Sequence, residues 1–401
     1  MSGAFSPRRE SLLLYALAGV QFTTVLDFML MMPLGPQLMR VFAISPTQFG
    51  LLVSSYTLTA AGIGFLAALF VDRFDRRHTL LALYACFTLT TILAATAQTY
   101  AWLLVARATA GAFGGLMGAC VFAIVGDVIP ERRRGSALGL VVSAFSIASI
   151  VGIPLSLTLA AYWSWRAPYV LLTLLGVVNF AVVFTTVPRM GAHVEAARAR
   201  NPITQVRAVF SEPNHLRAFL FAAMLTFSGF TVVPFISPYM VANVGVSETE
   251  LAWLYLVGGL VTLGVVRLVG RLSDLHGRRR IFIIVAAISM LGIFVTTHLP
   301  RVPLWVAILA SCLLMPTFSG RFVPAMAIIT AAVQPRLRGS FMSFNAAIQQ
   351  LASGSATFLS SLAIGKSPSG ELTHFGTVGW VAVGATLVCI FLARRVRSTR
   401  Q

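Results

Sequence analysis

The sequence has few charged residues and very few acidic ones. Of its 401 residues, 10% are charged and 57% are hydrophobic, and the mean hydropathy is +0.85. In soluble domains about a quarter of the residues are charged, so this shortage excludes an ordinary soluble domain. The composition indicates a protein of the lipid bilayer that crosses the membrane several times.

Cysteine is scarce, and the groups that carry catalysis are missing. Four cysteines lie in apolar runs without metal-ligand spacing, at Cys86, Cys120, Cys312 and Cys389. We interpret them as small core residues, and we expect no disulfide framework, no metal and no other cofactor. The sequence also has no nucleotide-binding loop and no histidine cluster. These absences argue against an enzyme.

Basic residues outnumber acidic ones, 30 to 12, which gives a net charge of +18. In a soluble protein such a charge would suggest nucleic acid. Here the arginines gather in alternate loops, and few basic residues fall on the other side: Arg40, Arg166, Arg301 and Lys366. Arginine-rich loops are typically cytoplasmic. The charge therefore predicts that both termini are cytoplasmic, in a bacterial inner membrane, and no nucleic-acid partner is expected.

Long apolar runs fill most of the chain. A membrane-spanning helix needs about 20 apolar residues, and a lone strand in lipid would leave its backbone groups unpaired. Twelve spans are predicted, at residues 12–39, 47–71, 79–98, 101–126, 136–160, 166–187, 216–241, 249–272, 281–299, 303–333, 340–364 and 375–393. The expected fold class is an all-α membrane protein with twelve transmembrane helices.

A charged turn occurs twice, as DRFDRRH from Asp72 and as DLHGRRR from Asp274, 202 positions apart. This offset indicates two parallel six-helix pseudo-repeats. We expect an N-terminal bundle at residues 1–187, a cytoplasmic linker at 188–215 and a C-terminal bundle at 216–401. Within the linker, residues 202–210 fit either a surface amphipathic helix or a solvated segment. Such duplication is typical of transporters, which bind solute between the halves.

Three motifs carry a family resemblance. The charged turn is similar to G-x-L-x-D-R-x-G-R-R, which the second copy keeps at Gly270, Leu272, Asp274, Gly277, Arg278 and Arg279, and the first copy at Asp72, Arg73, Arg76 and Arg77. The fourth predicted span resembles R-x-x-x-G-x-x-G, at Arg107, Gly111 and Gly114. The fifth span resembles a Gly-Pro antiporter signature, at Gly152 and Pro154, although Ile153 intervenes. Over its full length the chain resembles a major facilitator superfamily transporter of the drug and sugar efflux branch, which includes proton antiporters and arabinose efflux permeases.

The resemblance implies that the charged turns form a latch for the outward-facing state. Arginines beside a carboxylate can bond to a neighbouring helix terminus. Breaking such bonds would free the two halves to rock. The alternative is a basic loop that only sets the topology.

Asp27 is the one carboxylate deep within a predicted span. At 1.5 Å per residue it lies about 22 Å from Leu12, and Arg107 lies about 9 Å from the outer end of its span. These depths agree within a turn or two and favour a pair, whereas Arg321, about 27 Å into the tenth span, is a poorer match. Three roles stay open: a proton-coupling site at Asp27 and Arg107, a contact with a cationic substrate, and a static ion pair.

Solute contacts are expected from spans one, four, seven and ten. Weaker candidates are polar, aromatic or charged residues in or beside these spans: Gln21, Tyr56, Phe113, Met117, Phe227, Phe230, Arg321 and Asn345. Most aromatics and methionines in such spans only pack. Arg321 lies between Pro316 and Pro324 and would meet either an anionic substrate or freed backbone carbonyls.

These observations predict a secondary transporter that works by alternating access. It would be a monomer in the lipid bilayer, with proton entry driving export of a small organic solute and the proton as the coupling ion. One alternative is a facilitator or importer of a small metabolite. The other is a non-transporting receptor or scaffold on the same fold.

Overall fold

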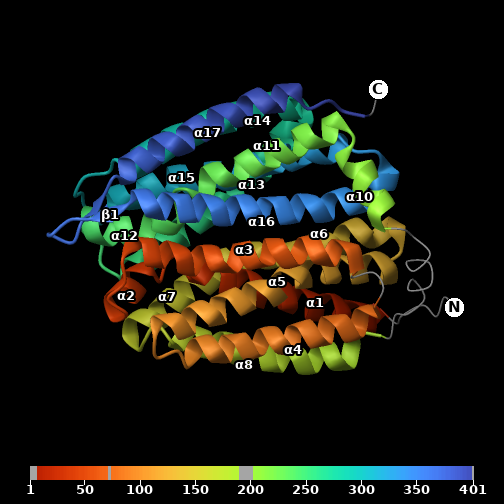
Figure 1. The fold of residues 1–401 in the computed structure, drawn as a ribbon, viewed down its shortest axis with the longest axis horizontal. Coiled ribbons are helices and arrows are strands. Elements are labelled where there is room, and N and C mark those ends of the chain that lie inside the picture. The colour runs from red at the N-terminus through yellow and green to blue at the C-terminus, as the bar shows by residue number, and fades with distance from the viewer. Residues whose placement is uncertain (1–6, 71–73, 189–201, 400–401) are drawn as a thin grey trace.

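The computed structural model describes residues 7–70, 74–188 and 202–399, and the chain folds into a bundle of long helices (Figure 1). The first half contains α1 (Pro7–Leu30), α2 (Gly35–Val41), α3 (Pro46–Phe70), α4 (Arg76–Ala95), α5 (Tyr100–Val128), α6 (Glu131–Ile147), the π-helix η2 (Ala148–Gly152), α7 (Ile153–Tyr162) and α8 (Ala167–Thr186). The helix α10 (Pro202–Phe210) follows.

The second half begins with α11 (Pro213–Phe230), which continues through η3 (Val233–Phe235), α12 (Ile236–Tyr239) and η4 (Met240–Val244). It goes on with α13 (Leu251–His276), α14 (Arg278–Thr297), α15 (Leu304–Ala331), η5 (Pro335–Leu337), α16 (Arg338–Ala363) and α17 (Phe375–Arg395). A small antiparallel pair, β1 (Gly365–Lys366) and β2 (Leu372–Thr373), joins Gly365 to Thr373 and Lys366 to Leu372.

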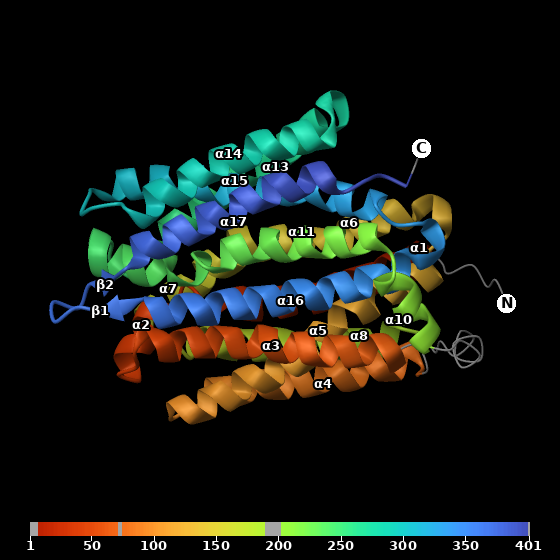
Figure 2. The ribbon, with the colours of Figure 1, turned by 45° about the horizontal axis from the view of Figure 1, so that its top comes forward.

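The predicted all-α membrane fold is confirmed. In the described part of the chain, eleven helical segments are long and apolar enough to cross a membrane. The eleventh predicted span, residues 340–364, corresponds to α16, which is long enough but rich in serine, asparagine and glutamine. It lies between α3 and α11 in both ribbon views (Figures 1 and 2).

Three predicted spans are less regular than expected. The span at 12–39 is wrong at its end: α1 stops at Leu30, and α2 begins only at Gly35. The sequence MMPLGP explains the break, because proline lacks the N–H that a continuing helix needs. In the fifth span a π-helical turn precedes Pro154, and the seventh span is broken near Pro234.

The two halves meet along two helix pairs: α3 packs along α16, and η2 and α7 pack along α13. The start of α1, the end of α17 and α10 lie at one end of the bundle, which we call the terminal end (Figure 1). The opposite end, with α2, α12 and β1, is called the distal end. The domain boundaries at residues 187/188 and 215/216 stay predictions.

Of the expected linker, residues 189–201 lie outside the described residues. Residues 202–210 form the helix α10, so the helical alternative is the one present. Its Phe210 packs against Phe219 on α11 and Phe344 on α16, with ring centroids 5.4 and 5.2 Å apart. The linker helix is therefore docked on the second half.

Glycines on α5 allow its backbone to approach α3 closely. A Cβ at Gly111 would lie 2.0 Å from the carbonyl oxygen of Tyr56, and a Cβ at Gly114 would lie 2.3 Å from the Tyr56 hydroxyl. Close helix approach through small residues is typical of membrane bundles. The glycines of the R-x-x-x-G-x-x-G motif therefore set the distance between α3 and α5.

We expect Gly111→Ala to lower the melting temperature and the yield of folded protein in detergent. The new methyl group would meet a backbone oxygen that cannot move alone, and overpacking of this kind costs about 1–3 kcal/mol. Gly126→Ala on the same helix is the control, because a Cβ there meets nothing within 4 Å. Equal losses in both variants would contradict the packing argument.

Candidate functional site

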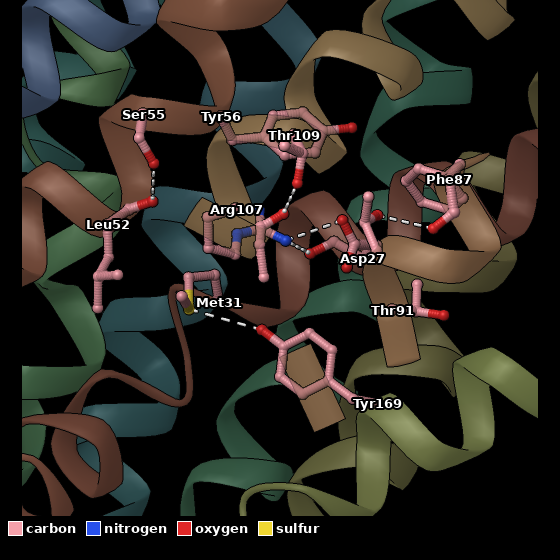
Figure 3. Close-up of polar contacts among 12 residues, drawn as sticks. Asp27, Met31, Leu52, Ser55, Tyr56, Phe87, Thr91, Arg107, Thr109 and Tyr169 are labelled. Carbon is pink, nitrogen blue, oxygen red and sulfur yellow. Dashed lines mark hydrogen bonds and ion pairs between the residues drawn. The ribbon is translucent and has the colours of Figure 1, made fainter. Parts of the chain in front are cut away.

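A buried ion pair lies inside the first half. Asp27 on α1 and Arg107 on α5 are each 1% exposed. Arg107 donates through Nη1 to Asp27 Oδ2 at 2.8 Å and to the Asp27 carbonyl oxygen at 3.4 Å (Figure 3). Removing two charges from water is costly, and mutual pairing offsets much of that cost. The structure thus brings together the two residues that the depth argument matched.

Two tyrosines frame this pair (Figure 3). The guanidinium carbon of Arg107 lies 4.7 Å from the centre of the Tyr56 ring, within the range of a cation–π contact. Tyr169 is fully buried, and its hydroxyl donates to Met31 Sδ at 3.6 Å. Among the described residues, Arg107 Nε has no hydrogen-bond partner. Asp27 is the carboxylate that pairs with Arg107 in the described part of the chain.

An aromatic contact connects the ion pair with the second half. Phe28 follows Asp27 in the chain, and its ring centre lies 5.4 Å from that of Tyr56. On its other side Phe28 lies 5.9 Å from Phe230, at the end of α11. Phe28 therefore contacts both Tyr56 in the first half and Phe230 in the second half.

At the distal end the two halves are joined. Arg40 on α2 forms a two-pronged ion pair with Glu248, in which Nη2 donates to Oε2 at 3.1 Å and Nη1 bonds to Oε1. The rings of Phe49 and Phe235 pack edge to face at 5.8 Å, and Thr47 Oγ1 donates to the carbonyl oxygen of Ser361 at 3.0 Å. These contacts hold the two halves together at the distal end.

We expect Glu248→Gln to shift the protein towards a distal-open form. The Arg40 side chain is 67% exposed, and exposed pairs contribute up to about 1 kcal/mol, which corresponds to about a fivefold change in population. Spin labels on exposed Gln48 and Thr249, one in each half, would report the shift as longer distances. The charge exchange Arg40→Glu with Glu248→Arg should restore the wild-type distances. A double variant as open as Glu248→Gln would contradict this role.

The first copy of the predicted latch is only partly described, since Asp72 and Arg73 lie outside the described residues. Arg76 Nε lies 3.1 Å from Asp127 Oδ2, near the end of α5. Arg77 donates to the carbonyl oxygen of Phe184 on α8 at 2.8 Å. Both arginines thus bond near helix ends, and both contacts lie within the first half.

The second copy makes similar contacts within its own half. Gly270 and Asp274 lie on the last turns of α13, and Gly277 joins α13 to α14 with a φ of 90° that favours glycine. Arg278 donates to the carbonyl oxygen of Ala327 at 3.4 Å, and Arg279 to that of Val396. The role of either copy as a latch between the halves stays a prediction.

The antiporter-like residues lie beside the ion pair. A Cβ at Gly152, the last residue of η2, would lie 2.8 Å from Leu26 Cδ1, next to Asp27 in the chain. Pro154 stands in the first turn of α7. On its other side η2 packs against α13, where Gly259 faces Ile150. The π-helical turn therefore lies between the Asp27 helix and the second half.

Arg321 is fully buried in the second half and is held by neutral groups. It donates to Ser228 Oγ at 2.8 Å, to Ser289 Oγ and Thr386 Oγ1 at 3.3 Å each, and to the Leu225 carbonyl oxygen at 3.4 Å. These partners come from α11, α14 and α17. None of these described contacts is with a backbone carbonyl that Pro316 or Pro324 would free, and contact of Arg321 with an anionic substrate stays a prediction.

The remaining candidate residues differ in their surroundings. Phe113 and Phe227 are half-buried, and Met117 is fully buried in the core of the first half. Gln21 is half-buried and faces Gly118 on α5. Asn345 is buried on α16. Their contact with solute stays a prediction.

Two aromatic residues of the site were not among the sequence candidates. Phe28 is adjacent to Asp27 in the chain, and Tyr169 is fully buried near the ion pair (Figure 3). The sequence feature that could have identified Tyr169 is the helical spacing of the buried face of α8. This face runs through Tyr169, Leu172, Gly176 and Val183.

Comparisons with known proteins show which family the chain is similar to. The family model of the Major Facilitator Superfamily matches residues 17–232 and 218–401. The MFS-type transporter YbcL of Bacillus subtilis (strain 168) is 22% identical over 94% of this chain and 95% of its own. A probable sugar efflux transporter of Pasteurella multocida (strain Pm70) is 24% identical over 61% of this chain and 59% of its own.

Solved structures show the same fold. The crystal structure of a D-xylose-proton symporter superposes with a TM-score of 0.80 at 18% identity, covering 98% of this chain and 99% of that one. The family match spans nearly the whole chain and agrees with the duplicated all-α bundle. The chain belongs to the Major Facilitator Superfamily and is a multi-pass membrane transporter of small solutes, not an enzyme.

Proposed function

We propose that the protein exports a small organic solute in exchange for protons. The observation that carries this proposal is the buried Asp27–Arg107 pair, 2.8 Å apart and 1% exposed on both sides. Ionisable residues inside a membrane bundle are costly, and they commonly mark proton or substrate paths. The family match supports a transporter, and the ion pair supplies a group that can carry the coupling ion.

The coupling step follows from the contacts of Asp27. When Asp27 is ionised it holds Arg107, and when it binds a proton it loses most of its attraction for the guanidinium. Arg107 would then be held mainly by its cation–π contact with the Tyr56 ring. A shift of Phe28, which contacts both Tyr56 and Phe230, would carry the change to the second half. Protonation would thereby change the relative stability of the two arrangements of the halves.

The orientation in the membrane and the direction of transport are supported by different observations. The arginine-rich loops favour a cytoplasmic position for the terminal end. Both chain ends would then lie on the cytoplasmic side of a bacterial inner membrane. The joined distal end would then face outward and open to release solute. A relative named as a probable sugar efflux transporter, and the antiporter-like Gly152 and Pro154, favour export, with a sugar-like compound as the solute. We also propose that the functional unit is a monomer of two six-helix bundles.

The test is solute movement in reconstituted vesicles with an imposed pH gradient. Exchange predicts that neutral sugars accumulate only in vesicles with an acidic interior, since protons leave as solute enters. Symport predicts accumulation only in vesicles with an alkaline interior, and a facilitator predicts none in either. A proton ionophore must remove the accumulation. Accumulation that survives the ionophore, or that needs an alkaline interior, would contradict proton-coupled export.

A further inference from the structure

The helix α16 is unusually polar for its central position. Its sequence, RGSFMSFNAAIQQLASGSATFLSSLA, is 26 residues long and lies between α3 and α11 (Figures 1 and 2). A helix packed between two membrane helices gains nothing from polar side chains unless each finds a partner. The polar side chains of α16 therefore need hydrogen-bond partners.

Contacts within the bundle explain several of these residues. Thr357 donates to the carbonyl oxygen of Phe230 at 3.2 Å, and Gln349 Oε1 accepts from Thr226 Oγ1 at 3.4 Å. Ser360 and Ser361 donate to carbonyl oxygens of their own helix at 2.7 and 2.6 Å. These side chains are satisfied either by α11 or by the backbone of α16.

Within the described residues of α16, three buried side-chain atoms have no hydrogen-bond partner: Arg338 Nε at the start of the helix, and Asn345 Oδ1 and Ser353 Oγ in its apolar part. Asn345 Oδ1 and Ser353 Oγ belong to residues that are 1% and 2% exposed, and neither has a hydrogen bond among the described residues. A buried group left unsatisfied costs about 1–3 kcal/mol, and such groups are rare in folded proteins. Each of these two atoms is therefore able to form a hydrogen bond with a further molecule.

The two atoms share one face of the helix with Gln349. Residues 345, 349 and 353 are spaced by four, so they follow one another along the same side of α16. The contact of Gln349 with Thr226 turns this side towards α11. Farther along, α11 ends at Phe230, whose ring contacts Phe28 beside Asp27. The polar face therefore leads to the aromatic contact between the halves.

No fixed charge lies on this face. From Gly339 to Ala363 the sequence contains no acidic, basic or histidine residue. The buried cation of the second half, Arg321, bonds to α11, α14 and α17. A charged solute placed here would lose its hydration without gaining a counter-charge, at a large cost. Carboxamide and hydroxyl groups instead both donate and accept, which matches the hydroxyl groups of an uncharged solute.

We propose that Asn345, Gln349 and Ser353 form a hydrogen-bonding wall of the solute site and bind an uncharged, polyhydroxylated solute. The proposal rests on the transport function proposed above and assigns binding residues to the sugar-like solute named there. It predicts selection by charge, because the wall offers several hydrogen bonds and no ion pair.

Equilibrium binding to purified protein, without any gradient, tests this proposal. The probes are D-glucose, D-glucosamine and D-gluconate, which share a carbon chain and differ in charge. We expect the wild-type protein to bind glucose at least about tenfold more tightly than either charged analogue, as loss of hydration without compensation implies. Asn345→Ala and Ser353→Ala should each weaken glucose binding about fivefold or more. Ser360→Ala is the matched control, because that hydroxyl already bonds to Ala356.

A structural role for the polar face would give other results. Asn345→Leu removes an unpartnered buried group, so we expect it to raise the melting temperature without solute while weakening glucose binding. The proposal is overturned if the wild type does not prefer glucose, or if the Asn345 and Ser353 variants bind it like the control. Asp27→Asn should still bind glucose, so a failure of proton coupling alone would leave this inference standing.

Discussion

Asp27→Asn will abolish the accumulation of solute driven by a pH gradient, while binding of uncharged solute persists. Asparagine keeps the size of the side chain and can still accept from Arg107, but it cannot exchange a proton. The two arrangements of the halves then no longer differ in proton affinity, and a gradient cannot bias them. Vesicles containing the variant should carry solute only down its own gradient.

The control for this experiment is Glu212→Gln, which changes an exposed carboxylate next to α11. It should accumulate solute as the wild type does. Asp27→Asn that accumulates solute under the same pH gradient would rule out proton coupling at this residue. A variant that instead loses all binding of a cationic solute would identify Asp27 as a direct substrate contact.

Arg107→Met will destabilise the protein by about 3–5 kcal/mol, the cost of leaving one partner of a buried ion pair alone. The Asp27 carboxylate is 1% exposed, and Arg107 is its partner at 2.8 Å. The thermal unfolding temperature in detergent should fall well below that of the wild type. The loss of transport would then follow from loss of fold as well as of coupling.

The double variant Asp27→Leu with Arg107→Met separates these two effects. Replacing a buried pair by apolar residues of similar size is often neutral or stabilising, so its unfolding temperature should return close to that of the wild type. Proton-driven accumulation should stay absent. A double variant that accumulates solute normally would show that the pair is only structural, whereas one as unstable as Arg107→Met alone would show that the measured loss does not come from the unpaired carboxylate.

The pair itself was predictable because charge is rare in this chain. With one carboxylate deep in an apolar span and an arginine at a similar depth, few partners were available. Tyr169 and Phe28 were not predictable in this way, since the sequence has 29 phenylalanines and 8 tyrosines and most aromatics in apolar spans simply pack. Their place beside the pair depends on how α1, α3, α8 and α11 are arranged.

The irregularities of the helices were likewise only partly predictable from the sequence. Prolines in MMPLGP and near Pro234 gave a local reason for interruption, but the length rule for membrane spans counted only apolar residues and passed over them. The polar character of α16 was visible in its letters. Which of its side chains are satisfied, and that Asn345 and Ser353 are not, follows only from what α3 and α11 place against it.

By itself the sequence determined that the protein is an all-α membrane bundle with a duplicated architecture, because apolar length, arginine-rich loops and a repeated charged turn are properties of the chain read in order. Only the tertiary structure decided that the halves are joined by Arg40 and Glu248 at the distal end, and that Phe28 touches Phe230. These contacts join residues about 200 positions apart. No local periodicity records them, because they depend on how two independently packed bundles face each other.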